Sequence, residues 1–266
     1  MPGAKTAAAT RLYRRTLRRY GWLPDMPDHR DHMYAAPAKV LKALPARVDL
    51  RPQCPPVYHQ GRLQSCTANA IGAALEFEQM RQRAGAFRPS RLFIYYHERL
   101  LERTVKHDAG AMIRNGIKSV AKWGAPPEYP HWPYIHYRFT MKPPRKVYAE
   151  ASKHQAVVYQ RLAQDLHQLR ACLAQGWPFV LGIAVFDSFE GRAVARSGRL
   201  AKPGRNERDR GGHAVMAVGY DHPRQRFILR NSWGPRWGIQ GYFTIPYAYV
   251  LDENLAADFW TIRLVE

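Results

Sequence analysis

Three residues of the chain have side chains that together support nucleophilic catalysis: Cys66, His213 and Asn231. A cysteine attacks as its thiolate and needs an imidazole that takes up and returns a proton. An asparagine can orient that imidazole without adding a charge. Cys66 opens an apolar-periodic run, which predicts a helix N-terminus, where the helix dipole lowers a thiol pKa. A free cysteine is more often simply packed in a core, so Cys66 alone does not decide between the two roles.

The positions of the other two residues favour a catalytic role. His213 lies in the segment GGHAVMAVGYD and Asn231 in LRNSWGPRWG, each on a predicted strand or strand end in the second half of the chain. Cys66 lies in the first half, on a predicted helix. The three side chains can therefore converge only across a cleft between two lobes, as in a two-lobed nucleophilic enzyme.

Four segments resemble the papain-like cysteine peptidases, and the resemblance extends from about residue 45 onward. LPARVDLR resembles the mature N-terminus of the family, VYHQGRLQSCTANA its Gln-Gly-x-x-x-Ser-Cys segment, GGHAVMAVGYD its histidine strand, and RNSWGPRWGIQGYFTI its Asn-Ser-Trp-Gly segment. The spacing from Cys66 to His213 falls in the family range, and that to Asn231 slightly exceeds it. The resemblance implies a bacterial-type cysteine endopeptidase that needs no cofactor or metal.

The resemblance also implies a role for each residue of the site. Cys66 would be the nucleophile that carries a thioester, His213 the general base and later acid, and Asn231 the residue that orients the imidazole. Gln60 would join the Cys66 backbone N–H in stabilising the oxyanion. Trp233 would cover the hydrogen bond between the histidine and the asparagine.

Substrate-binding residues are implied in the same way. HDAGAMIRNGI resembles the segment that binds the substrate backbone as an added strand. Met112 and Ala214 would line an apolar pocket for the residue two before the cut. Gln64 stands where the family usually has glycine, which predicts a narrowed entrance to the cleft. The residues implied to bind substrate are Ala109, Gly110, Ala111, Met112, Gln64, Gly212, Ala214 and Trp233.

Hydrophobic periodicity predicts the elements that position these residues. Helices are expected over 66–85, from Ser90 through RLFIYYHERLLE, over 111–124 and over 160–175, with a proline-rich stretch at 124–147. Strands are expected over 177–186, 212–221, 225–233 and 241–250. Helices first and strands second predict an α+β, papain-like two-lobed fold with a helical lobe and a β-rich, barrel-like lobe.

Three regions follow from this pattern. Residues 1–45 form an N-terminal extension, with a short helix at 10–19 followed by extended chain that lies on the domain. The extension is shorter than the usual pro-domain of the family, and we expect it to cover the cleft and regulate access. Residues 46–135 form the helical lobe, which carries the nucleophile, and residues 136–266 form the β-rich lobe, which carries His213 and Asn231.

Charge supports an alternative function. The 266 residues include 41 Lys and Arg against 21 Asp and Glu, a net charge of +20, with basic excess in residues 1–50 and 192–210. Such a surface attracts anions, although no nucleic-acid-binding motif accompanies it. The alternative is a weakly active or inactive relative that binds a nucleotide or nucleic acid. A transglutaminase-like Cys-His-Asp enzyme is disfavoured by Asn231.

Composition limits the location and the partners. The three cysteines are odd in number and widely spaced, which favours neither a disulfide framework nor a metal cluster. No apolar run is long enough to span a membrane, and the N-terminus is rich in arginine. We therefore expect a cytoplasmic protein, with export by another route left open. The expected partner is a protein or peptide substrate; the sequence does not indicate an oligomeric state.

Overall fold

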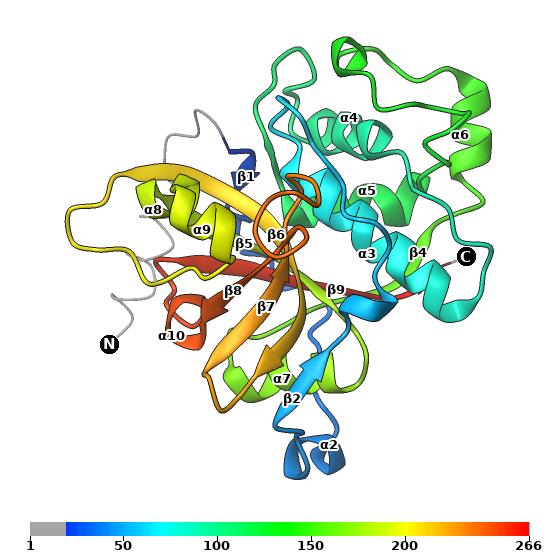
Figure 1. The fold of residues 1–266 in the computed structure, drawn as a ribbon. Helices are drawn as coiled ribbons and strands as arrows, with labels where there is room; N and C mark the ends of the chain where they lie inside the picture. Colours follow the sequence, from blue (N-terminus) through cyan, green and yellow to red (C-terminus); the bar gives the residue numbers. More distant parts are fainter. Residues whose placement is uncertain (1–19, 266) are drawn as a thin grey trace.

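Four helices make up one side of the molecule in the computed structural model, which describes residues 20–265. They are α3 (Cys66–Gln82), α4 (Arg91–Leu101), α5 (Ile113–Trp123) and α6 (Arg145–Ala151). Figure 1 shows them together, with α3 nearest the sheet. Helix α3 contacts α4 and α5 on one side and β6 and β9 on the other. It is therefore the element that joins the helical and β-rich parts.

The sequence predicted the starts of these helices better than their ends. Ser90 caps α4, since its side chain accepts a hydrogen bond from the backbone N–H of Phe93 at 3.2 Å. Gly124 ends α5 with a φ of 73°. Helix α3 ends before the predicted Gly85, because Arg83 itself adopts the left-handed conformation, with a φ of 56°.

Seven strands form one sheet in the order β4-β9-β5-β6-β7-β8, with β2 pairing with β6. The first and last strands of this path do not pair, so the sheet is open rather than closed into a barrel. All of its paired strands run antiparallel. The strands are β2 (Arg47–Asp49), β4 (Ala156–Arg161), β5 (Phe179–Phe186), β6 (Asp209–Asp221), β7 (Arg226–Arg230), β8 (Tyr242–Pro246) and β9 (Ala256–Val265).

The sequence did not predict three of these strands, β2, β4 and β9. Strand β4 is at an edge of the sheet and is largely exposed or half-buried, so it lacks a strong apolar signal. It occupies the start of the predicted 160–175 helix, which is α7 (Leu166–Ala174) in the structure. The end of the predicted 241–250 strand is instead helix α10 (Tyr247–Val250).

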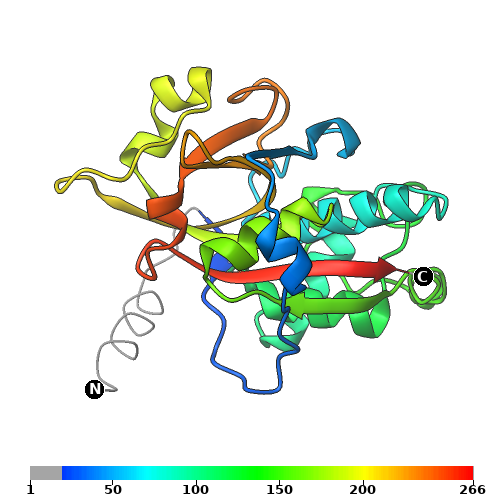
Figure 2. The same cartoon turned by 90° about the horizontal axis from the view of Figure 1, so that it is seen from below.

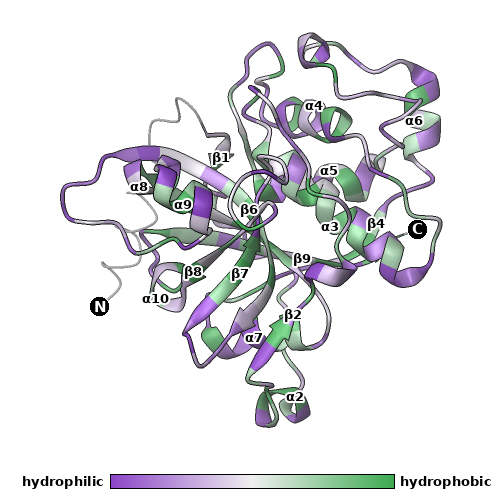
Figure 3. Cartoon of the chain, viewed as in Figure 1, coloured by the Kyte–Doolittle hydropathy of each residue, from purple (hydrophilic) through white to green (hydrophobic). Residues whose placement is uncertain are grey.

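Short helices complete the fold around the sheet. Helix α6 packs on α4, where the Tyr148 hydroxyl lies 3.0 Å from Nε2 of His97. The loop between α9 and β6 is strongly hydrophilic, whereas the strands near α3 carry hydrophobic segments (Figure 3). The remaining short elements are α2 (Ala38–Lys42), α8 (Asp187–Glu190), α9 (Arg192–Ser197), η1 (Arg51–Gln53) and η2 (His136–Arg138). No helix in the described part of the chain is long and apolar enough to cross a membrane.

Residues 20–31, which we call the strap, lie between the helical and β-rich parts (Figures 1 and 2). Strand β1 (Trp22–Leu23) of the strap pairs in parallel with β3 (Ala111–Met112), directly before α5. The helix predicted at 10–19 lies outside the described residues. From the strap to Pro37 the chain contains no helix, in agreement with the prediction, whereas α2 (Ala38–Lys42) was not predicted.

Candidate active site

Cys66 is the first residue of α3, and its side chain is fully buried. Its sulfur accepts hydrogen bonds from the backbone N–H groups of Gly21, in the strap, and Ala214, in β6. Ala214 directly follows His213, so the thiol of the helical lobe lies beside the strand that carries the imidazole. The convergence of the two halves across an interface, expected from the sequence, is present in the structure.

His213 and Asn231 are paired at this interface. Nε2 of His213 lies 2.8 Å from Oδ1 of Asn231, and both side chains are buried. The same Oδ1 also accepts the backbone N–H of Ser232 at 2.8 Å, which fixes the orientation of the amide. Since Oδ1 accepts, Nε2 must carry the proton of the neutral ring. Nδ1 is then left with a free lone pair, and among the described residues it has no hydrogen-bond partner.

Aromatic rings surround the imidazole. The ring centroid of Trp233 lies 5.3 Å from that of His213, and Phe189 lies 6.0 Å from it. Trp237 packs edge-on against Trp233 at 5.2 Å. This apolar surround buries His213 and lowers its pKa to about 4, so the ring is neutral and able to accept a proton at neutral pH.

Gln60 is buried beside the same cluster. Its backbone N–H donates to the Ser232 carbonyl at 2.8 Å, and its Oε1 accepts the Ser232 hydroxyl at 2.6 Å. Its Nε2 donates to the carbonyl of Leu63 at 3.0 Å. These bonds hold the amide nitrogen on the loop that leads into Cys66. The nitrogen donates to a protein carbonyl, and its role as an oxyanion donor stays a prediction.

The strap covers the nucleophile. Besides the Gly21 contact with Cys66, the Tyr20 ring lies 5.6 Å from His213 and 5.9 Å from Trp233, and its hydroxyl donates to Glu190 at 2.5 Å. The Gly21 carbonyl accepts the Ala111 N–H at 2.7 Å. The strap is thus an extended peptide segment hydrogen-bonded across the catalytic cysteine candidate.

This cover reverses the expected ionisation of the thiol. The sequence predicted a lowered pKa at the helix N-terminus, but burial raises the pKa of Cys66 to about 12, even though backbone N–H groups partly offset the effect. The physical reason is that the strap removes the water that would solvate a thiolate. The neutral His213 ring supplies no positive charge to compensate. The covered site therefore holds a neutral thiol and a neutral imidazole.

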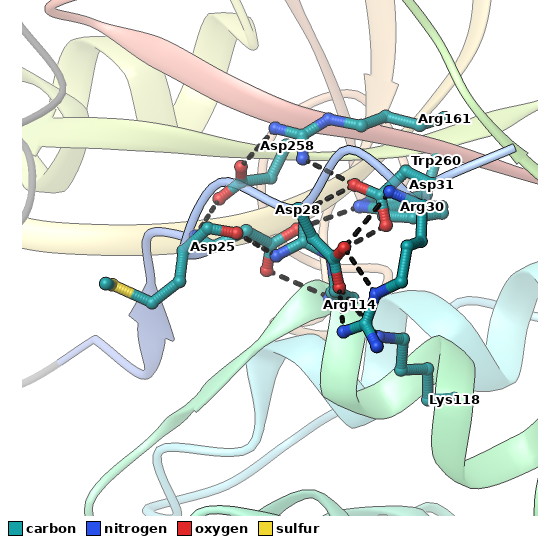
Figure 4. A network of polar contacts seen from close by, with 10 residues as sticks. Asp25, Asp28, Arg30, Asp31, Arg114, Lys118, Arg161, Asp258 and Trp260 are labelled. Carbon is teal, nitrogen blue, oxygen red and sulfur yellow. Dashed lines mark hydrogen bonds and ion pairs between the residues drawn. The ribbon is translucent and has the colours of Figure 1, made fainter. Parts of the chain in front are cut away.

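Polar contacts hold the strap to both lobes (Figure 4). The side chain of Asp31 forms ion pairs with Arg114 of α5 and with Arg161 of β4, the latter at 2.9 Å. Asp25 accepts the Arg114 backbone N–H at 3.0 Å and the Trp260 indole N–H at 2.9 Å. Because α5 and β4 belong to different lobes, the strap links the two lobes as well as covering the site.

The remaining substrate-binding candidates lie around the strap. Gly110, with a φ of 72°, directly precedes β3, and a side chain there would collide with the Gly21 backbone. Ala109 is half-buried just before it. Gln64 is turned toward Asp108, whose carbonyl accepts its Nε2 at 2.7 Å. The Gln64 backbone carbonyl, rather than its side chain, abuts Gly21.

Sequence reasoning missed several residues that shape this site. Tyr20 contacts His213, Asp108 accepts the backbone N–H of Gln64, and Glu190 contacts Tyr20. The sequence did not single out these three residues, because each contact joins segments that are distant in the chain. Cys54 and Cys172 lie elsewhere, half-buried and buried respectively, and both are free thiols. No cluster of three or more metal-ligating side chains occurs in the part of the chain that the structure describes.

A thiol at a helix N-terminus, beside an imidazole oriented by an asparagine at the meeting of two unlike lobes, defines a cysteine hydrolase site. The model for "Papain family cysteine protease" matches residues 44–254. The chain therefore belongs to the papain family of cysteine proteases, and its α+β fold is papain-like.

Individual relatives agree with this assignment. The chain is 44% identical to xylellain, a cysteine protease from Xylella fastidiosa, with a TM-score of 0.89 over 95% of this chain and 98% of that one. It is 41% identical to an uncharacterised peptidase C1-like protein of Acanthamoeba polyphaga mimivirus, over 93% of this chain and 88% of the relative. Digestive procathepsin L 3 of Tenebrio molitor shares the fold at 19% identity, with a TM-score of 0.70 over 98% of this chain and 80% of that one.

Proposed function

We propose that this papain-family protease is an endopeptidase held in a latent state by its strap. The observation that carries the proposal is the peptide segment already bound across Cys66, which supports binding of an extended substrate backbone in the cleft. An open cleft of about 660 Å³ extends from Tyr20 along Gln60 and Leu63 to Trp233 and Trp237. A substrate could thus occupy both sides of the nucleophile, as cleavage within a chain requires.

The reaction follows from the arrangement of the three residues. Once the strap leaves, Nδ1 of His213 takes the thiol proton and Sγ of Cys66 attacks the carbonyl carbon of the substrate. The C–N bond breaks, the amine departs with the proton from His213, and a thioester remains on Cys66. Water attacks the thioester with His213 as base, which releases the acid and restores the thiol. Asn231 keeps Nε2 protonated and the ring in place throughout.

In the proposed reaction the oxyanion is stabilised by two donors, one of which already has a hydrogen-bond partner. Its proposed donors are the Cys66 backbone N–H and Nε2 of Gln60. Nε2 has a second proton besides the one that it gives to Leu63, because a primary amide carries two donors. Gln60 can therefore keep its present contact and still donate to the substrate oxygen.

Covalent labelling tests this proposal directly. The protein is incubated with an epoxide thiol inhibitor, and the cleavage of fluorogenic peptides and casein is followed together with the intact mass. We expect one inhibitor molecule per chain, attached to Cys66, and a loss of cleavage in proportion to labelling. Labelling of Cys54 or Cys172 with cleavage unaffected would contradict the proposal.

We propose as a second role that a groove on the β-rich side binds a nucleotide phosphate. The groove has a volume of about 490 Å³ and is lined by five arginines and two aspartates, Arg47, Arg51, Arg199, Arg224, Arg226, Asp49 and Asp221. Three of the arginines pair with the aspartates. Burial and the nearby Arg199 lower the pKa of Arg226, so two like charges face each other there. An anion between them would relieve this repulsion.

Binding of ADP, measured by calorimetry, tests the groove. We expect the affinity to fall by about tenfold or more between roughly 50 and 200 mM salt, as charge-driven binding requires. At a fixed salt concentration, Arg199→Gln should weaken ADP binding relative to wild type. Arg145→Gln, a substitution of an exposed residue in the helical part, should leave binding unchanged. If the two substitutions weaken ADP binding equally, ADP binds to the basic surface in general and not to the groove.

A further inference from the structure

Helix α3 begins at a serine whose side chain does not cap it. Ser65 occupies the N-cap position without a side-chain cap hydrogen bond, whereas Ser90 at the same position of α4 accepts the Phe93 N–H at 3.2 Å. A serine in this position ordinarily accepts from the second or third N–H of the helix. In α3 the second N–H, that of Thr67, is hydrogen-bonded to the sulfur of Cys66 instead. The missing cap therefore leaves a donor for the nucleophile.

The Ser65 hydroxyl is engaged by Tyr134, in the proline-rich stretch before α6. The Tyr134 hydroxyl lies 2.9 Å from the Gln60 carbonyl and 2.5 Å from Oγ of Ser65. Since a carbonyl only accepts, the single proton of Tyr134 goes to Gln60, and the Ser65 hydroxyl must donate to the Tyr134 oxygen. Oγ of Ser65 accepts Nδ2 of Asn69 at 3.2 Å. The buried Ser65 hydroxyl thus has an acceptor and a donor, neither of which is a backbone N–H of α3.

The same contacts fix the backbone of both proposed oxyanion donors. The Ser65 carbonyl accepts the backbone N–H of Asn69 at 3.0 Å and its Nδ2 at 2.8 Å. That carbonyl and the Cys66 N–H belong to one planar peptide unit, so anchoring the oxygen sets the direction of the N–H. The bond from Tyr134 to the Gln60 carbonyl anchors the residue that carries the other donor.

Arg91, the first residue of α4, holds both partners of Ser65 in place. Its guanidinium lies over the Tyr134 ring, 4.1 Å from the centroid, and donates to Oδ1 of Asn69 at 2.8 Å. A bidentate ion pair with Glu128, at 2.8 Å and 2.9 Å, fixes the guanidinium, and both side chains are largely buried. A planar guanidinium bound on several sides has little freedom to move. Tyr134 and Asn69 are therefore positioned by the fold before a substrate binds.

We propose that Tyr134 is a positioning residue for the reaction: its hydroxyl keeps the Ser65 side chain from capping α3, so that the first N–H groups of the helix serve the sulfur and the oxyanion. The proposal rests on the endopeptidase function proposed above, and Tyr134 acts through Ser65 and Gln60 rather than on the substrate. Without the Tyr134 hydroxyl, the Ser65 side chain is free to turn to the ordinary N-cap rotamer. There it competes with the Cys66 sulfur for the Thr67 N–H.

Tyr134→Phe tests this role, because it removes one oxygen atom and leaves the ring beneath Arg91. We expect kcat for peptide hydrolysis to fall by about 10–30-fold while KM changes by less than about threefold. Removing an oxyanion donor outright costs roughly 10²–10³ in kcat, and here the donors are only displaced. A strap that competes with substrate alters KM and not kcat. A kcat within about twofold of wild type, or a loss confined to KM, would overturn the proposal.

Adding Ser65→Ala separates positioning from a structural defect. Structural damage at Tyr134 should grow when a neighbouring side chain is also removed, whereas lost positioning should be partly repaired, because alanine has no hydroxyl that could cap α3. We expect Tyr134→Phe/Ser65→Ala to have a kcat at least about threefold above that of Tyr134→Phe. A double variant no faster than Tyr134→Phe would contradict the proposal.

Tyr148→Phe is the matched control. It removes a tyrosine hydroxyl from a half-buried position in the helical part, where that hydroxyl lies 3.0 Å from Nε2 of His97. Its kcat should equal that of wild type. A loss of kcat as large as that of Tyr134→Phe would mean that the removal of any such hydroxyl slows the enzyme, and would refute the specific role of Tyr134.

Alkylation of Cys66 by iodoacetamide measures the thiol without peptide cleavage. At one fixed pH, the rate in Tyr134→Phe should fall by about threefold to tenfold, the effect of one hydrogen bond to a charged group, and should recover in the double variant. If wild type cleaves no peptide, the endopeptidase function fails, and the alkylation rates still decide the role of Tyr134. Equal alkylation rates in wild type and Tyr134→Phe would refute that role.

Discussion

Cys66→Ala reduces kcat/KM for peptide cleavage by about 10⁴-fold or more, to the level of the background reaction. The reason is that no other group near His213 can form the thioester. The measurement is the hydrolysis of a fluorogenic peptide by equal amounts of folded wild type and variant. Because the change only removes a sulfur atom from a buried position, the strap and α3 should stay in place.

Cys54→Ala is the matched control. It makes the same chemical change at a half-buried thiol whose sulfur donates to the Leu50 carbonyl at 3.4 Å, away from the cleft. Its activity should equal that of wild type. Residual cleavage in Cys66→Ala above a tenth of the wild-type rate would place the nucleophile elsewhere.

Gly21→Ala raises the peptidase rate and the alkylation rate of Cys66 by about 10–100-fold, the second large effect. A Cβ at Gly21 would lie 1.6 Å from the backbone oxygen of Gln64, and backbone cannot move aside as a flexible side chain can. Forcing such an overlap costs about 1–3 kcal/mol, which shifts the strap toward its released state by roughly that factor. One methyl group thus activates the enzyme.

The pH dependence of Cys66 alkylation also measures the release of the strap. The covered thiol has a pKa of about 12, above the ordinary value of 9.0. The strap therefore binds more strongly over the protonated thiol, and its binding weakens as the pH rises from 9.0 toward 12. In Gly21→Ala, water returns to the site, and the midpoint of the iodoacetamide rate profile should move well below that of wild type.

Met26→Ala serves as the control for this prediction. Met26 belongs to the strap, but its side chain is 53% exposed and only its backbone carbonyl contacts Arg114. Both rates should match those of wild type. An unchanged alkylation rate in Gly21→Ala would mean that the strap does not limit access to Cys66.

The strap also bears on how the two lobes are held together. Asp31 bridges Arg114 and Arg161, which belong to opposite lobes, and both guanidinium groups are at least partly shielded from water. Charge-assisted hydrogen bonds of this kind are stronger than exposed pairs. Release of the strap therefore removes cross-lobe contacts at the same time as it opens the cleft.

The helices and strands were predictable where one signal dominated. Ser90 marks the start of α4, and the apolar runs in β5 and β6 mark buried strands, because capping and periodicity act over a few residues. Strand β4 escaped prediction since an exposed edge strand has no strong apolar pattern. Strand β9 carries an aromatic and β-branched run, Phe259 to Ile262, and this signal was available in the sequence but not used.

Residue order was enough to predict that Cys66 lies on a helix of one part and that His213 and Asn231 lie in the β-rich part, because side-chain chemistry and local motifs carry that information. The place of Gly21 over Cys66 and the turn of Asp258 toward Trp22 depend on contacts between segments more than a hundred residues apart or on one irregular strand pairing. The raised pKa of Cys66 follows from that cover. Burial and long-range hydrogen bonds arise from the folded arrangement as a whole, so only the tertiary structure revealed the cover over Cys66.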